Sequence, residues 1–276
     1  MHVRITAVGS AIVTMLPLGA ISLVASIRYN SSTLAFIGLG LVFWGAVLLY
    51  IRPEEQTKKA LLEAALLPSL ATLNRMIQEL GYTGDATYLP PKYFTNPETA
   101  KMYIPKKKNA TLPTPEQTQP YEDQPLARTT GGLLLTPPGV QLSKLLEKSL
   151  GKSFIQTDLE NLRQNLPRLF IDDLEIAQNL EIQAQNDTIG KKEDDQAFAN
   201  HLESKTINAI LTKPIYRTLF TETEDPQQPT GLIGGPICSA IAIAITKATG
   251  KPVRIMNLKS SEDGNTIEAS YEIIEE

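Results

Sequence analysis

The sequence predicts an α+β protein, with an N-terminal two-helix transmembrane hairpin followed by a soluble domain in which an antiparallel sheet packs against helices. Two uncharged apolar stretches, residues 7–27 and 33–51, stand near the start. In the C-terminal part, from residue 133, helix and strand patterns follow in the order helix, helix, strand, strand, helix, strand, strand. The last strand, residues 267–273, alternates apolar and polar residues, as a strand with one buried and one wet face does.

Each apolar stretch has about the 20 residues that a helix needs to cross a bilayer. Glycines such as Gly19, Gly38, Gly40 and Gly45 would let two such helices approach closely. A cleaved signal peptide is the alternative for the first stretch. Lys and Arg flank the outer ends of the hairpin, whereas its turn carries only Arg28. This predicts a two-span protein of the cell membrane with both ends cytoplasmic and the lipid bilayer as a partner.

Composition excludes several classes of function. The net charge is −4 and the pI is about 5.4, so the chain has no general basic field and we expect no nucleic-acid partner. The single cysteine, Cys238, excludes an internal disulfide and a multi-thiolate zinc site. We therefore expect no metal and no cofactor.

The soluble part divides by composition into three sections after the hairpin of residues 1–53. Residues 54–105 read as a membrane-proximal helix and a short strand hairpin, the helix (54–80) being kinked or divided at Pro68. Residues 106–132 are rich in proline and poor in large apolar groups, which predicts a mobile or extended linker. Residues 133–276 form the predicted α+β C-terminal domain.

Local signals place the elements of these sections. Gly151 predicts a helix end, Pro167 another, and the run 191–195 an exposed charged loop. The predicted helices are 140–150, a second one starting at 157 or 158, and 236–249; the predicted strands are 87–89, 101–104, 180–184, 206–211, 253–258 and 267–273.

The candidate ligand-binding residues lie at the start of the helix 236–249. Gly234 and Gly235 could expose backbone N–H groups to an anion, or they could form a plain tight turn before Pro236. Cys238 could be activated by the helix N-terminus, or it could be a small core residue. His201, Asp172, Asp173 and Glu175 are interpreted as solvated surface groups, and we assign no catalytic residue.

The run Gly234–Ala240, its helix as far as Pro252 and the final hairpin resemble a family of uncharacterised archaeal membrane-anchored proteins. The order of elements from Gly139 onward is similar to the ligand-binding domain of 4-vinyl-reductase-type sensors and TRAPP-like subunits. That resemblance implies a dimerising module that binds a small molecule or lipid. Metal-binding members of that superfamily use further cysteines, which this chain lacks.

We therefore expect a membrane-anchored protein with a cytoplasmic binding or assembly domain and no evident catalytic activity. One alternative is a membrane-tethered sensor of a small apolar ligand, and another is an enzyme with Cys238 as nucleophile. The helix 236–249 is apolar on more than one side. Its second face must meet the two upstream helices, a second copy in a homodimer, or a small apolar ligand.

Overall fold

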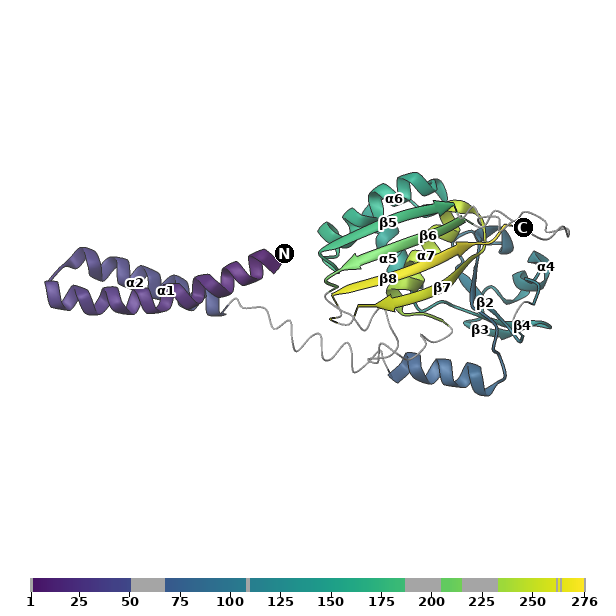
Figure 1. Ribbon diagram of the computed structural model, residues 1–276, viewed down its shortest axis with the longest axis horizontal. Helices are drawn as coiled ribbons and strands as arrows, with labels where there is room; N and C mark the ends of the chain where they lie inside the picture. The colour runs from purple at the N-terminus through teal and green to yellow at the C-terminus, as the bar shows by residue number, and fades with distance from the viewer. Residues whose placement is uncertain are drawn as a thin grey trace, which may run out of the picture. The chain divides into compact units, whose positions relative to one another are not determined.

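The computed structural model describes residues 2–50, 68–107, 110–186, 205–214, 233–261, 263 and 265–275. The chain divides into two compact units, Met1–Leu61 and Leu62–Glu276, which are called unit 1 and unit 2 below. Unit 1 is a helical hairpin, and unit 2 combines an antiparallel sheet with helices (Figure 1). The α+β class predicted for the C-terminal part is confirmed. The two helices of unit 1 are α1 (His2–Tyr29) and α2 (Ser32–Tyr50).

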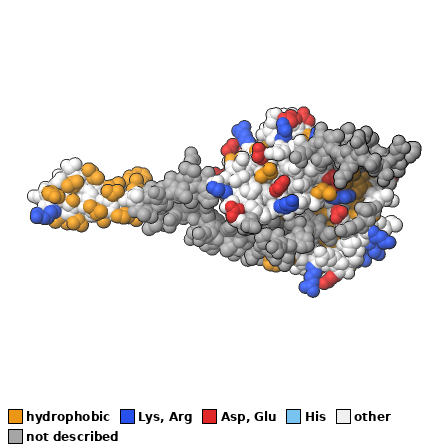
Figure 2. All heavy atoms as spheres, in the orientation of Figure 1, with side chains coloured by type: hydrophobic (Ala, Val, Ile, Leu, Met, Phe, Trp, Pro, Cys, Tyr) orange, Lys and Arg blue, Asp and Glu red, His pale blue; other side chains and the backbone are white. Residues whose placement is uncertain are grey.

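Glycines bring α1 and α2 into close contact. A Cβ atom at Gly19 would lie 2.8 Å from a methyl carbon of Val42, and one at Gly38 would lie 2.8 Å from Leu23 Cγ. No side chain larger than hydrogen fits at such distances, so the glycines set how near the two helices come. Other large apolar side chains of the hairpin, Phe36 and Phe43 among them, are exposed on its outside (Figure 2).

The predicted transmembrane hairpin is wrong. Over the residues that the structure describes, neither hairpin helix nor any other has the combination of length and apolar character that crossing a membrane requires. The assignment to the cell membrane with two spans and cytoplasmic ends, which depended on that hairpin, is corrected with it.

Unit 2 is built on one eight-stranded sheet in the order β3-β4-β2-β1-β7-β8-β6-β5, with every neighbouring pair antiparallel. On β8, Ile267, Ala269 and Tyr271 are buried and alternate with more exposed residues, as the sequence pattern indicates. The strands are β1 (Thr87–Leu89), β2 (Lys101–Pro105), β3 (Leu126–Arg128), β4 (Gly132–Leu135), β5 (Asn179–Asn186), β6 (Lys205–Thr212), β7 (Val253–Ser260) and β8 (Thr266–Ile273).

Helices cover one face of this sheet and enclose the main core (Figure 1). α7 is the central helix, because it packs against β1, β7 and β8 on one side and against α5 and α6 on the other. The Asp158 carboxylate caps α6 by accepting a hydrogen bond from the Asn161 N–H at 2.7 Å. The helices are α5 (Val140–Leu150), α6 (Leu159–Arg168) and α7 (Pro236–Thr249), with short turns η1 (Pro91–Tyr93), η3 (Phe154–Gln156) and the π-helical η4 (Leu169–Asp173).

The predicted linker, residues 106–132, belongs to the folded body of unit 2. It contains α4 (Pro115–Thr118), η2 (Gln119–Tyr121) and β3, and β3 pairs with β4 at the edge of the sheet. The buried Thr118 hydroxyl donates a hydrogen bond to the Tyr93 carbonyl at 2.7 Å. The boundaries drawn at 105 and 132 are therefore corrected, since β1 to β4 continue the same sheet as β5 to β8.

Other departures are local. Pro167 lies within α6, and the helical path continues into η4 instead of ending there. Of the predicted helix 54–80, residues 68–79 are helical, and Pro68 stands at the first of them. The rest of that prediction, the charged run 191–195 and His201 lie outside the described residues.

Candidate functional site

The predicted ligand-binding turn at Gly234 and Gly235 is closed. Gly234 has a φ of +66°, which favours glycine, and Gly235 is the N-cap of α7 with Pro236 in the first turn. Ile237 and Cys238, the next residues of the helix, have no exposed surface. Within the described residues, the turn itself is also buried at Gly234 and Gly235.

The start of α5 covers the start of α7. The Gly139 N–H donates a hydrogen bond to Ser239 Oγ at 3.0 Å. A Cβ atom at Gly139 would lie 2.3 Å from the Ala240 backbone nitrogen and 2.5 Å from the Pro236 carbonyl oxygen. Only glycine allows this approach, so Gly139 sets how closely the start of α5 packs against the first turn of α7.

Cys238 lies in a buried group with two tyrosines. Tyr271 Oη donates a hydrogen bond to the Cys238 carbonyl at 3.2 Å, and Tyr88 Oη donates one to the Ile233 carbonyl at 3.1 Å. Burial, with the neighbouring Cys238 and Tyr88 adding to it, raises the pKa of Tyr271 well above its ordinary value. The Cys238 thiol is fully buried, so it is not presented to a substrate.

α7 is covered by elements of its own chain. It contacts the upstream helices α5 and α6. Ile243, on the second apolar face, is 3% exposed and lines a small cavity together with residues of β1 and β2. The apolar residues of α7 from Ile237 to Ile245 are buried.

A buried ion cluster joins α7 to α5 and to the segment before β2. Lys247 Nζ lies 3.0 Å from both carboxylate oxygens of Glu147 and 3.3 Å from Glu98 Oε2. The Glu147 carboxylate also accepts hydrogen bonds from Ser153 Oγ and the Phe154 N–H, each at 2.8 Å. Lys247 and Glu147 are almost fully buried, whereas Glu98 is half-exposed. The charges of the pair are compensated, so the cluster ties three segments together.

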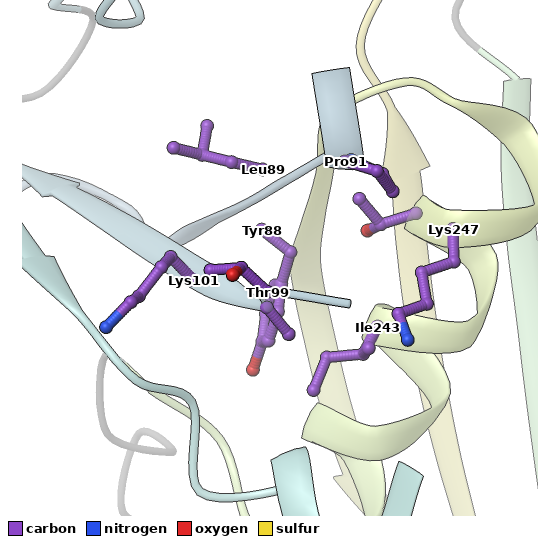
Figure 3. A pocket seen from close by; sticks show the side chains of 9 residues that line it. Tyr88, Leu89, Pro91, Thr99, Lys101, Ile243 and Lys247 are labelled. Carbon is purple, nitrogen blue, oxygen red and sulfur yellow. The ribbon is translucent and has the colours of Figure 1, made fainter. Parts of the chain in front are cut away.

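A cavity of about 10 Å³ lies beside this cluster, between α7 and the strands β1 and β2. Ile243 and Lys247 reach toward it from α7, and Tyr88 and Thr99 line it from the other side (Figure 3). The volume suits about one water molecule. It gives no room for the small apolar ligand that the sensor interpretation requires.

Lys101, on β2, is also buried but points away from that cavity (Figure 3). Its ammonium donates hydrogen bonds to the Gln124 carbonyl and, at 3.0 Å, to Thr136 Oγ1. Burial lowers the pKa of Lys101, and the carboxylates of Asp123 and Glu122 act in the opposite direction. This lysine holds the segment before β3 against β2.

Sequence reasoning missed these buried charges. Lys247 is the only charged residue in the otherwise apolar run 236–249, and that was an available signal of a buried pair. Its partner Glu147 had no such signal. Within the described residues, no group of three or more His, Cys, Asp or Glu side chains is placed to hold a metal ion.

The outside of the hairpin carries most of the exposed large apolar side chains in the described part of the chain. Among the described residues, sixteen large apolar side chains are exposed; six of them are scattered over unit 2, and the other ten lie on α1 and α2. One face of α1 is open and largely apolar, with Ile21, Val24 and their neighbours on it and Arg28 and Tyr29 at its end. The ten are Leu18, Ile21, Val24, Ile27, Tyr29, Phe36, Ile37, Leu39, Phe43 and Trp44.

Comparison with known proteins places the chain in a family. Residues 1–199, well over half of the chain, match the family described as "Domain of unknown function (DUF7982)". The chain belongs to this family. The matched part of this DUF7982 member includes the hairpin, α5, α6 and β1 to β5, whereas β6, α7, β7 and β8 lie beyond it. No curated protein and no solved structure matches the chain.

Proposed function

We propose that this protein is a non-catalytic assembly module, and that its hairpin associates with the hairpin of a second copy. The observation that carries the proposal is the set of ten exposed apolar side chains on α1 and α2. Proteins rarely leave a large contiguous apolar surface uncovered, and such surfaces are typically interaction sites. Because the inner faces of the two helices are already in contact through glycines, the outer faces are the ones available to a partner.

The hairpin offers both halves of a self-complementary contact. Phe36 and Phe43, seven residues apart on α2, share a helix face and are 77% and 60% exposed. The apolar face of α1 that carries Ile21 and Val24 offers a surface on which such side chains can pack. In a twofold dimer the aromatic residues of each copy would pack on this face of the other. Buried aromatic anchors in pockets commonly dominate the energy of such interfaces.

Trp44 gives a local readout of this association. It is the only tryptophan of the chain and is 59% exposed on α2. In a dilution series of the full chain, iodide should quench Trp44 weakly at high protein concentration and strongly at low concentration. The double variant Phe36→Ser/Phe43→Ser should move that transition to roughly 100-fold higher concentration, about tenfold for each aromatic residue removed.

A matched control removes exposed apolar side chains elsewhere. Leu145→Ser/Met256→Ser makes the same kind of change on unit 2 and should leave the Trp44 transition in place. Trp44 quenching that does not depend on protein concentration would overturn the proposal. So would recovery of the chain as a monomer whose hairpin is covered by lipid vesicles.

The geometry gives less support to the two alternatives. A sensor of a small apolar ligand needs a larger cavity than the space for one water molecule beside Lys247. An enzyme that uses Cys238 needs an accessible thiol, and this one is fully buried.

A further inference from the structure

The two edges of the sheet in unit 2 differ in length and protection. The edge strand β3 has three residues, whereas the edge strand β5 has eight and pairs with β6 at all eight positions without a bulge. Natural proteins usually protect a long edge with proline, lysine, a bulge or a covering segment. β5 contains no proline and no lysine. In the described part of the chain, β6 is its only strand partner.

We propose that the outer edge of β5 pairs antiparallel with β5 of a second copy, so that one sheet continues across two chains. An identical strand is a self-complementary partner about a twofold axis. Its backbone would satisfy the N–H and C=O groups that the outer edge presents. This surface lies on unit 2 and does not depend on the association of the hairpins.

The side chains of β5 select one register for this pairing. Leu180 and Ile182 are buried on the core face, and Glu181 and Gln183 lie exposed on the other face. In paired strands, two residues that lie opposite each other point to the same face of the sheet. About a twofold axis this holds only when some residue of β5 lies opposite the same residue of the second copy. The axis must therefore pass at a residue and not between two residues. An axis through Glu181 would place two carboxylates directly opposite, which is destabilising.

An axis through Ile182 avoids this repulsion. It sets Glu181 opposite Gln183 of the second copy, where the amide can donate to the carboxylate. It also sets the exposed Ala184 opposite Leu180, so that the apolar face continues into the partner. An axis through Gln183 would instead set Leu180 opposite the polar Asn186. The register centred on Ile182 is the one that the residues favour.

A cross-linking experiment on the full chain tests this register. In the double variant Glu181→Cys/Gln183→Cys, the thiol at position 181 would face the thiol at position 183 of the second copy. A short bifunctional maleimide should then link two chains. The native Cys238 is fully buried and should not react, which the chain without added cysteines will show. The matched control is Glu268→Cys/Ser270→Cys, with the same spacing on the inner strand β8, which should give no linked dimer.

Two measurements keep the outcomes distinct. Near-ultraviolet circular dichroism should show that both cysteine variants keep the native fold of unit 2. The cross-link should persist when Phe36→Ser/Phe43→Ser is added, because that change affects the hairpin alone. A folded Glu181→Cys/Gln183→Cys chain that links no better than the β8 control would overturn the proposal. Loss of the link in the hairpin-substituted chain would also overturn it, while leaving the hairpin proposal standing.

Discussion

Removing the charge of Lys247 should destabilise unit 2 strongly. In Lys247→Met the side chain keeps much of its length, but the Glu147 carboxylate loses the ammonium that lies 3.0 Å from both of its oxygens. Glu147 is only 10% exposed, so water cannot replace the lost partner. Breaking a buried pair by removing one member typically costs about 3–5 kcal/mol. We expect a loss in this range in the free energy of unfolding.

Removing the charge of the partner, Glu147, should lower the free energy of unfolding by less. In Glu147→Gln, Lys247 keeps Glu98 at 3.3 Å, and the amide oxygen can still accept the hydrogen bonds of Ser153 and Phe154. We expect a loss of about 1–3 kcal/mol, the cost of an imperfectly satisfied buried group. The double variant Lys247→Met/Glu147→Gln leaves no uncompensated buried charge. It should therefore be more stable than Lys247→Met alone.

Urea unfolding of the full chain measures these differences. Near-ultraviolet circular dichroism of tyrosine is the suitable signal, because Tyr88, Tyr103 and Tyr271 are buried in unit 2, whereas Trp44 lies in unit 1. Lys251→Met is the control: it breaks a solvent-exposed pair and should cost at most about 1 kcal/mol. If Lys247→Met cost no more than this control, or if the two cluster variants were additive, the reasoning would be refuted.

Other positions give further tests. Asn74→Leu should raise the stability of unit 2 by about 1–2 kcal/mol, because both amide atoms of Asn74 are buried and have no partner among the described residues; urea unfolding measures it. Gly139→Ala should lower the midpoint of the same transition, because its Cβ would meet the backbone of α7. Tyr271→Phe should cost about 0.5–1.5 kcal/mol through the loss of one buried hydrogen bond. Hydrogen bonds within the β7–β8 turn lower the pKa of Asp263 from 3.8 to about 2. The carboxylate therefore stabilises the turn above pH 3.8. The protection of the turn amides, relative to the exchange rate of an unfolded chain at the same pH, should fall as the pH falls through about 2, but not in Asp263→Asn.

Elements with strong local start, stop or alternation signals could be predicted from the sequence. α7 has the predicted bounds, since Gly235 and Pro236 open it and Gly250, in the left-handed region, closes it. The strand 267–273 differs from β8 by one residue, because its alternation follows from one face lying on the core. Both signals are short-range, so one sequence is enough to read them.

The region 106–132 could not be predicted in this way. Its prolines indicate a linker by composition, yet Pro115 stands in the first turn of α4, where proline is well tolerated. β3 and β4 are strands because they pair with each other and β4 pairs with β2. Pairing across the sheet is a tertiary effect that local composition does not contain.

The buried ion cluster could not be predicted from the sequence for the same reason, because it is also made by tertiary contacts. Glu147 and Lys247 are 100 residues apart in sequence, and Glu98 is 149 residues from Lys247. The sequence shows one lysine in an apolar helix, but only the fold brings its partners to it. The predicted site at Gly234, Gly235 and Cys238 likewise looks open in the sequence, but all three residues are buried in the fold.

In the hairpin, the spacing of the glycines, and not only their number, indicates which helix face makes the contact. Gly38 and Gly45 are seven residues apart, lie on one face of α2 and meet α1, whereas a Cβ atom at Gly40 would meet nothing within 4 Å. Residue type alone does not distinguish these three glycines. The spacing of seven residues does, because it places Gly38 and Gly45, but not Gly40, on the face toward α1. Phe36 and Phe43 have the same period and are displaced by two residues, roughly 200° around the helix. The contact face toward α1 therefore defines the opposite face, and the two phenylalanines stand where a second hairpin would bind.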